Sequence, residues 1–233
     1  MRMKNKWEEQ AATRQKHKDQ LKAKKKGSSL ERGVPYLTER PTILIVCEGE
    51  NTEPSYFRQF RLTNATVKAV GVGYNTISLV ERAIELSERD TYDQVWCVFD
   101  KDDFPAENFN EAIQLATRNR FKVAYSNQSF EYWLILHFND HQGGALHRDD
   151  YHKKINDCIG PWGCSYDSKG SKIVSADLFD LLEAKDPIEK EERRLLACKR
   201  ARRIYHLFDH SSPASEESST TVFLLVEELA KYL

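Results

Sequence analysis

The stretch that decides the fold is residues 42–60, TILIVCEGENTEPSYFRQF. Its first part, Thr42–Cys47, is short, β-branched and apolar, which predicts a buried strand. Glu48 and Glu50 follow at once. A carboxylate at the end of a buried strand is costly unless a helix N-terminus, a basic side chain or a metal ion meets it. Aromatic residues at helical spacing then predict a helix over Glu53–Leu62.

The same alternation of strand and helix continues along the chain. We predict further strands at Ala65–Val72, Asp93–Phe99 and Phe121–Ser126, and helices at Ser78–Arg89, Asn108–Asn119 and Phe130–Phe138. After residue 140 only helices are expected, at Leu146–Cys158, Ser175–Ala184, Glu189–Asp209 and Thr220–Leu233. Strands that alternate with helices indicate a parallel sheet with right-handed crossovers. The predicted fold class is therefore α/β, a parallel sheet flanked by helices, with a C-terminal helical extension.

The first forty residues differ in composition from the rest of the chain. Residues 1–40 carry 12 Lys or Arg and 5 Asp or Glu, although the whole chain has a formal net charge of −1. Because apolar residues are sparse there, we expect residues 1–39 to be a basic arm, partly disordered or conditionally helical, that contacts phosphate or a partner. A solvated tail is the alternative. An α/β core over 40–140 and a helical extension over 141–233 would complete the chain.

The sequence also bears on the compartment. No apolar run approaches the ~18 residues of a membrane span, and the N-terminus is charged where a signal peptide would be apolar. The five cysteines are odd in number and contain no C-x-x-C pair. We therefore expect reduced thiols in a cytoplasmic protein that has no contact with membranes.

Acidic residues follow three of the predicted strands. Glu48 follows the first strand, Asp100 and Asp102 follow the third, and Glu131 comes shortly after the fourth. In an open parallel sheet, function collects at the carboxyl ends of the strands. Hard cations prefer carboxylate oxygens, so this set predicts a Mg²⁺ or Mn²⁺ site. Each residue also has a simpler interpretation, as a turn residue, a helix cap or a core acid paired with an arginine.

A basic run lies on the predicted helix Glu189–Asp209. One interpretation is a ridge that contacts the phosphates of a nucleic acid through Arg193, Arg194, Lys199, Arg200, Arg202 and Arg203. The other is a solvated helix face on which acidic and basic side chains pair at i, i+4 spacing. The sequence leaves both open.

Three strings, ILIVCEGENTEPSYF, VWCVFDKDD and SNQSFEYWLILHF, resemble the RloB-like family, and the resemblance extends over roughly residues 40–230. It implies a bacterial phage-defence protein of the abortive-infection kind with a Toprim-type domain. In such a domain Glu48, Asp100 and Asp102 would bind Mg²⁺ for phosphodiester chemistry, and Glu131 matches an acidic position of the family's own motif. The resemblance also implies an ATPase partner encoded alongside. This chain has no G-x-x-x-x-G-K-[ST] motif of its own.

We therefore expect a Mg²⁺-dependent nuclease that acts on DNA or RNA. No general acid is assigned, and Lys101, Lys169 and Lys172 are candidates by charge alone. The second hypothesis is a non-catalytic Toprim-like subunit that binds nucleic acid or regulates the ATPase. A D-x-D phosphatase with Asp100 as nucleophile is a third, and it is disfavoured by Phe104, which stands where Thr or Val would be expected. The sequence leaves homo-oligomerisation open.

Overall fold

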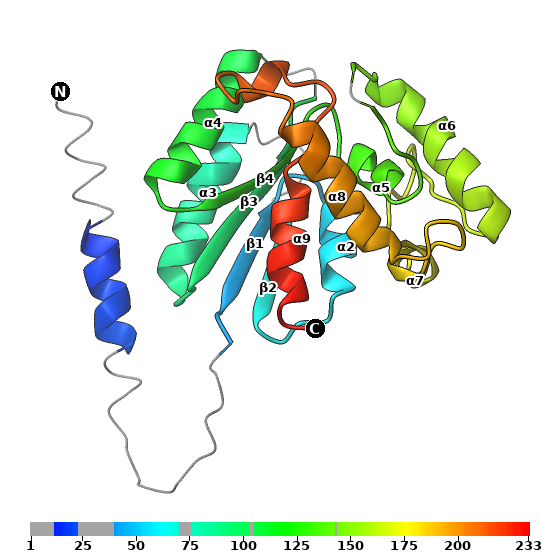
Figure 1. The fold of residues 1–233 in the computed structure, drawn as a ribbon. Coiled ribbons are helices and arrows are strands. Elements are labelled where there is room, and N and C mark those ends of the chain that lie inside the picture. The colour runs from blue at the N-terminus through cyan, green and yellow to red at the C-terminus, as the bar shows by residue number, and fades with distance from the viewer. Residues whose placement is uncertain (1–11, 23–39, 70–75, 103–104, 143) are drawn as a thin grey trace, which may run out of the picture.

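The computed structural model describes residues 12–22, 40–69, 76–102, 105–142 and 144–233 (Figure 1). Within these residues one sheet is formed by β1 (Ile43–Cys47), β2 (Ala65–Ala69), β3 (Gln94–Asp100) and β4 (Lys122–Ser126). The strand order is β2-β1-β3-β4, and every pair is parallel. The predicted α/β class and the parallel sheet are confirmed, and the architecture is consistent with a Toprim-type fold.

Helices connect the strands and continue after the last one. They are α2 (Thr52–Arg58), α3 (Thr76–Arg89), α4 (Ala106–Arg118), α5 (Glu131–Leu136), α6 (Arg148–Ile159), α7 (Ala176–Glu183), α8 (Arg193–Tyr205) and α9 (Val222–Ala230). Short 3₁₀ turns lie at η1 (Gly160–Trp162) and η2 (Pro213–Ser215). Each predicted helix is present with shifted ends. The helix predicted to begin at Ser78 already begins at the buried Thr76.

Alternate residues of the strands enter two hydrophobic cores, one on each face of the sheet. Ile43 and Ile45 pack with side chains of α2, α5, α8 and α9. Leu44 and Val46 pack with side chains of α3 and α4, on the other side of the sheet in Figure 1. Helices on both faces explain why the strands are apolar throughout and do not alternate with polar residues. The C-terminal helices thus share a core with the sheet.

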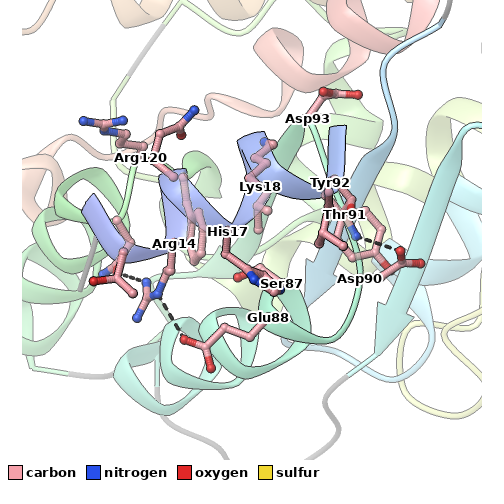
Figure 2. Close-up of a pocket in the computed structure, with 16 residues that line it drawn as sticks. Arg14, His17, Lys18, Ser87, Glu88, Asp90, Thr91, Tyr92, Asp93 and Arg120 are labelled. Atoms are coloured by element: carbon pink, nitrogen blue, oxygen red, sulfur yellow. Dashed lines mark hydrogen bonds and ion pairs between the residues drawn. The ribbon is translucent and has the colours of Figure 1, made fainter. Parts of the chain in front are cut away.

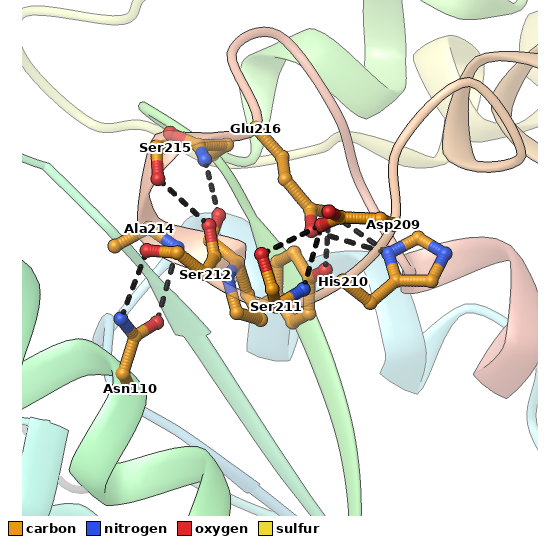
Figure 3. Close-up of polar contacts among 11 residues, drawn as sticks. Asn110, Asp209, His210, Ser211, Ser212, Ala214, Ser215 and Glu216 are labelled. Carbon is orange, nitrogen blue, oxygen red and sulfur yellow. Dashed lines mark hydrogen bonds and ion pairs between the residues drawn. The ribbon is translucent and has the colours of Figure 1, made fainter.

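Residues 209–221 return from α8 to the carboxyl end of β4 (Figure 3). Oδ1 of Asn110, on α4, accepts a hydrogen bond from the main-chain N–H of Ala214 at 3.1 Å. Nδ1 of His210 lies 3.1 Å from a carboxylate oxygen of Glu216, which is buried. These contacts hold the segment in place before it reaches the strand.

A helix over residues 12–22 lies at the end of the sheet where β3 and β4 begin (Figure 2). Nε of Arg14 is 3.1 Å from a carboxylate oxygen of Glu88, and Nζ of Lys22 is 2.6 Å from Oδ1 of Asp93. A cavity of about 490 Å³ lies between this helix and the segments that precede β3 and β4. The cavity is therefore at the amino-terminal edge of the sheet, away from the acidic residues that follow the strands.

Some expectations about chain organisation concern segments that the structure does not describe. Residues 1–11 and 23–39 of the basic arm, and residues 70–72 of the predicted second strand, are outside the described residues. The boundaries at 40 and 141 stay predictions. No helix in the described ranges combines the length and the apolar content that crossing a membrane requires.

A carboxylate-rich candidate active site

The acids that follow β1 and β3 meet at the carboxyl edge of the sheet. The two strands pair in parallel with Cys47 opposite Val98, and the N–H of Glu48 continues the ladder by donating to the carbonyl of Val98 at 2.9 Å. Oε2 of Glu48 then accepts a hydrogen bond from the N–H of Asp100 at 3.3 Å. The register thus places the turn after β1 against the last residue of β3.

Asp100 also connects to the turn that follows β4. Its Oδ2 accepts a hydrogen bond from the N–H of Phe130 at 3.0 Å. Its Oδ1 is buried and has no hydrogen-bond partner among the described residues. A buried carboxylate oxygen without a partner is costly, because it has lost water and gained nothing in return. This atom therefore needs a donor or a cation that the described protein atoms do not provide.

Asp102 lies in a tight turn beside Asp100. Its φ of +44° is in the left-handed region, which Asp tolerates better than most residues. Its N–H donates to the carbonyl of Gln128 at 3.1 Å, so the turns after β3 and β4 are joined. Burial, and after it the negative charge of Asp102, raises the pKa of Glu48, so these two carboxylates are close enough to interact.

The C-terminal half of the chain holds the turn after β4 in place. The N–H of Asn127 donates to the carbonyl of Ser219 at 2.8 Å, and Ser126 forms an isolated antiparallel bridge with Thr220. Gln128 donates a side-chain hydrogen bond to Glu217 at 2.6 Å. The position of Asp102 therefore depends on residues more than a hundred positions later in the sequence.

Glu131 is the first residue of α5, and both of its carboxylate oxygens are held by hydroxyl groups. Ser129 Oγ donates to Oε2 at 2.6 Å, and the hydroxyl of Tyr166 donates to Oε1 at 2.9 Å. The Tyr166 hydroxyl is also 3.0 Å from Oγ1 of Thr52, in the first turn of α2. Glu131 thus lies between the sheet edge and the segment that follows α6.

Sequence reasoning missed Glu53 as a residue of this site. Glu53 is 5% exposed, in the first turn of α2. A Cβ atom at Gly49 would lie 2.4 Å from Oε2 of Glu53, so the carboxylate packs directly against the main chain of this glycine and would have to shift if a side chain were added there. The signal in the sequence was the spacing, because Glu53 precedes Tyr56 by three and Phe57 by four residues and so falls on the buried face of the helix.

The carboxylates raise one another's pKa. Burial, followed by the negative charges of Asp102 and Glu53, raises the pKa of Glu48 to about 7. Burial, followed by Glu131 and then Asp102, raises the pKa of Glu53 to about 7, against an opposing hydrogen bond from Gly49. The pKa of Asp100 is raised well above its usual value by burial and then by its acidic neighbours. Desolvation and like charges both disfavour the ionised forms.

These five residues, the carboxylate cluster, are Glu48, Glu53, Asp100, Asp102 and Glu131. Within the part of the chain that the structure describes, no three Cys, His, Asp or Glu side chains are already arranged as ligands of one ion. The cluster nevertheless fits a hard divalent cation chemically, because its donors are oxygens, its charges repel and one buried oxygen lacks a partner. Glu48, Asp100 and Asp102 are the residues that would hold Mg²⁺ or Mn²⁺, with Glu53 beside them.

Of the two interpretations that the sequence left open for α8, the basic ridge does not hold for Arg193. This side chain is 1% exposed, and its guanidinium lies over the rings of Trp162 and Phe138, with centroid distances of 4.5 and 5.2 Å. Its Nε is 3.4 Å from a carboxylate oxygen of Asp186. A planar guanidinium stacks well on aromatic rings, so Arg193 packs inward and is not placed to contact phosphate.

The other five basic residues of the ridge are engaged by the protein itself. Nη1 of Arg200 donates to the carbonyl of Leu136 at 2.9 Å. The remaining four form ion pairs: Arg194 with Glu183, Lys199 with Glu191, Arg202 with Glu227 and Arg203 with Asp140. These pairs favour the interpretation of a charge-balanced surface, although Lys199, Arg202 and Arg203 keep more than a third of their side chains exposed.

A comparison with known protein families shows which family the chain belongs to. A family model described as RloB-like protein matches residues 43–229. The chain belongs to the RloB-like family. The match runs from the first residue of β1 into α9, so it includes the whole carboxylate cluster of this RloB-like chain. No curated protein and no solved structure matches the chain.

Proposed function

We propose that this RloB-like protein is a Mg²⁺- or Mn²⁺-dependent nuclease that hydrolyses phosphodiester bonds in DNA or RNA. The observation that carries the proposal is the gathering of the carboxylate cluster at one sheet edge, with Oδ1 of Asp100 buried and unpartnered among the described residues. The role in antiphage abortive infection and the Toprim-type character of the site rest on the resemblance of the sequence strings around Glu48, Asp100 and Glu131.

The residues of the cluster have separate roles in this proposal. A bound cation would activate a water and offset the charge that develops on the phosphate. Glu48, Asp100 and Asp102 would hold that cation by their carboxylate oxygens. Glu131, whose two oxygens are fixed by hydroxyl donors, would bind the cation as a further ligand or orient the attacking water. Glu53 adds negative charge beside the ligands and strengthens the demand for a cation.

The substrate phosphates need positive charge near the cluster, and the loop over residues 166–174 carries it. This loop is anchored at both ends to the first turn of α2, by Tyr166 to Thr52 and by the N–H of Val174 to Oγ of Ser55 at 2.9 Å. That turn directly follows Glu48 and Glu50. Two lysines of the loop, at positions 169 and 172, form no ion pair within the described residues. Because the basic residues of α8 are buried or engaged by other protein groups, we expect these lysines to meet a phosphate backbone instead.

A non-catalytic subunit that binds nucleic acid, or that regulates an ATPase encoded alongside, is the second candidate. Lys101, Lys169 and Lys172 remain candidates for neutralising the leaving oxygen, and none of them is assigned as a general acid. Binding without cleavage would distinguish this candidate from a nuclease.

The test is incubation of the purified protein with DNA and with total RNA in Mg²⁺ or Mn²⁺, with and without the co-encoded ATPase. We expect cation-dependent cleavage that Asp100→Asn and Glu48→Gln abolish. Asp180→Asn, which alters an exposed carboxylate on α7, is the matched control and should cleave as the wild type does. Binding without cleavage under every condition, together with a changed ATPase rate, would overturn the nuclease proposal in favour of the regulatory subunit.

A further inference from the structure

Tyr166 connects the C-terminal half of the chain to the carboxylate cluster. The residue is 2% exposed, and its hydroxyl lies 2.9 Å from Oε1 of Glu131. Its main chain is fixed to α6 by Asn156, which accepts a hydrogen bond from the N–H of Tyr166 at 3.0 Å and donates one to its carbonyl at 2.9 Å. The hydroxyl is therefore aimed by the backbone as well as by the packing of the ring.

The direction of the hydrogen bonds follows from the chemistry of the three groups. A phenol has one proton to donate, and a carboxylate can only accept. Tyr166 therefore donates to Glu131, and Oγ1 of Thr52, 3.0 Å away, donates to the oxygen of Tyr166. The result is a chain of donors that runs from the first turn of α2, through the phenol, to the carboxylate.

This arrangement leaves Glu131 oriented but not fully occupied. Ser129 and Tyr166 each donate one hydrogen bond, to different carboxylate oxygens. A carboxylate oxygen has two acceptor positions, so each oxygen keeps one for another group. A group that hydrogen-bonds to a metal ligand from outside the coordination sphere typically fixes the orientation of that ligand and leaves its other lone pairs available to the metal. The hydroxyls of Ser129 and Tyr166 have this relationship to Glu131.

We propose that Tyr166 is a positioning residue, whose hydroxyl holds Glu131 in the orientation in which this carboxylate serves a divalent cation and its water at the cluster. The inference rests on the proposed metal-dependent function and deepens it. If Tyr166 has this role, the segment between α6 and α7 is part of the site, and the residues at the edge of the sheet do not form the complete site alone. Tyr166 does not touch the reacting atoms in this account and acts only through Glu131.

The test measures Mn²⁺ affinity by isothermal titration calorimetry, without substrate. Tyr166→Phe removes only the hydroxyl, and we expect roughly 10-fold weaker Mn²⁺ binding, within the range usual for groups that support a metal ligand. Tyr132→Phe is the matched control, because it removes a buried tyrosine hydroxyl that lies 3.0 Å from the His141 ring and contacts no cluster carboxylate. This control should bind Mn²⁺ as the wild type does.

A double variant separates positioning from a general structural effect. If Tyr166 acts through Glu131, Tyr166→Phe should cause no further loss of affinity in a Glu131→Gln background. Ser129→Ala removes the other donor to Glu131 and should weaken Mn²⁺ binding in the same direction, which keeps the test valid should Tyr166→Phe fail to fold. Additive losses in the double variant would overturn the positioning role.

The outcomes also separate this inference from the proposed function. Wild-type protein that binds Mn²⁺, together with an Asp100→Asn variant that does not, would support the metal site. Should Tyr166→Phe and Ser129→Ala then bind Mn²⁺ as tightly as the wild type, the positioning role alone is overturned. Should the wild type bind no Mn²⁺ at all, the metal-dependent function is overturned, and the positioning role with it.

Discussion

Oε2 of Glu48 accepts a hydrogen bond from the main-chain N–H of Asp100, at 3.3 Å, across two neighbouring parallel strands. The contact joins residues that lie fifty-two positions apart in the chain. It exists because β1 and β3 are adjacent and end at the same edge, which is where a parallel sheet collects the residues that follow its strands. The carboxylate cluster is built around this contact.

Replacing Asp100 by Asn should make the metal-free protein more stable. At pH 7 the unfolded chain has an ionised Asp100, so folding must either bury that charge or bind a proton, and Asn requires neither. Asn can still accept the hydrogen bond from Phe130. We expect a rise in melting temperature of about 2–4 °C, the size that ~1 kcal/mol gives in a chain of this length. Differential scanning calorimetry with EDTA measures it.

The same variant should lose the response to divalent cations. Adding Mn²⁺ should raise the melting temperature of the wild type and leave that of Asp100→Asn unchanged, since a ligand stabilises only the state that binds it. Asp180→Asn is the control, and its response should equal that of the wild type. An Asp100→Asn protein that melts well below the wild type would make Asp100 a structural residue and weaken the case for a metal site.

The pH dependence of stability should report the raised pKa values of Glu48 and Glu53. Both are about 7 in the folded protein against an ordinary value of 4.5. Between these values the folded state binds more protons than the unfolded state, so the free energy of unfolding falls as pH rises from about 4.5 to about 7. Glu53→Gln has no ionisable group at this position. The free energy of unfolding of this variant, relative to that of the wild type, should therefore increase over that interval, by on the order of 1–3 kcal/mol.

Urea denaturation at pH 5 and at pH 7.5, in EDTA, measures this difference. Glu50→Gln is the matched control, because Glu50 belongs to the same turn but is exposed to solvent. A stability difference between Glu53→Gln and wild type that is constant with pH would show that the buried carboxylate does not titrate as described.

Much of the fold was accessible from the sequence, and the site was accessible only in part. Short apolar runs such as Thr42–Cys47 predicted the strands, because a strand whose two faces are both covered by helices is apolar at every position. The predicted topology was enough to place Glu48 and Asp100 together at the carboxyl edge of the sheet. The supports of the site were not predictable, since Tyr166 reaches Glu131 from a loop whose position depends on tertiary packing.

For the basic helix α8, the sequence left two interpretations open. The count of six Lys and Arg suggested a cationic surface, but a sequence does not reveal the partners of a side chain. Arg193 turns inward onto Trp162, and Arg194 pairs with Glu183 from α7. Those acidic partners lie on other elements, where an i, i+4 rule on one helix does not find them.

Salt-dependent binding should separate the loop lysines from the basic helix. We expect the double variant Lys169→Ala and Lys172→Ala to weaken oligonucleotide binding and to reduce the slope of log affinity against log salt by about one unit for each phosphate that the variant no longer neutralises. The matched double variant Arg202→Ala and Arg203→Ala removes two charges already paired with Glu227 and Asp140, and should leave the slope unchanged. The reverse result would restore α8 as the phosphate-binding surface.

Deleting residues 1–28 should leave the fold intact. The contacts of the helix over 12–22 include the ion pairs of Arg14 with Glu88 and of Lys22 with Asp93, and pairs of this kind contribute roughly 0–1 kcal/mol each. We expect a small change in melting temperature and weaker binding to nucleic acid or to the ATPase. The full-length variant Arg14→Ala and Lys22→Ala controls for the loss of these ion pairs alone. A deletion variant that no longer melts cooperatively would show that the arm is part of the core.

Whether the carboxylate cluster is a metal-dependent nuclease site is decided by the rate of cleavage by wild type and by Asp100→Asn, measured side by side in Mg²⁺ or Mn²⁺ and again in EDTA. We expect cleavage of DNA or RNA by the wild type with the cation, none in EDTA, and none by Asp100→Asn in either condition. Equal cleavage by the two proteins, or cleavage by the wild type that persists in EDTA, would contradict this expectation.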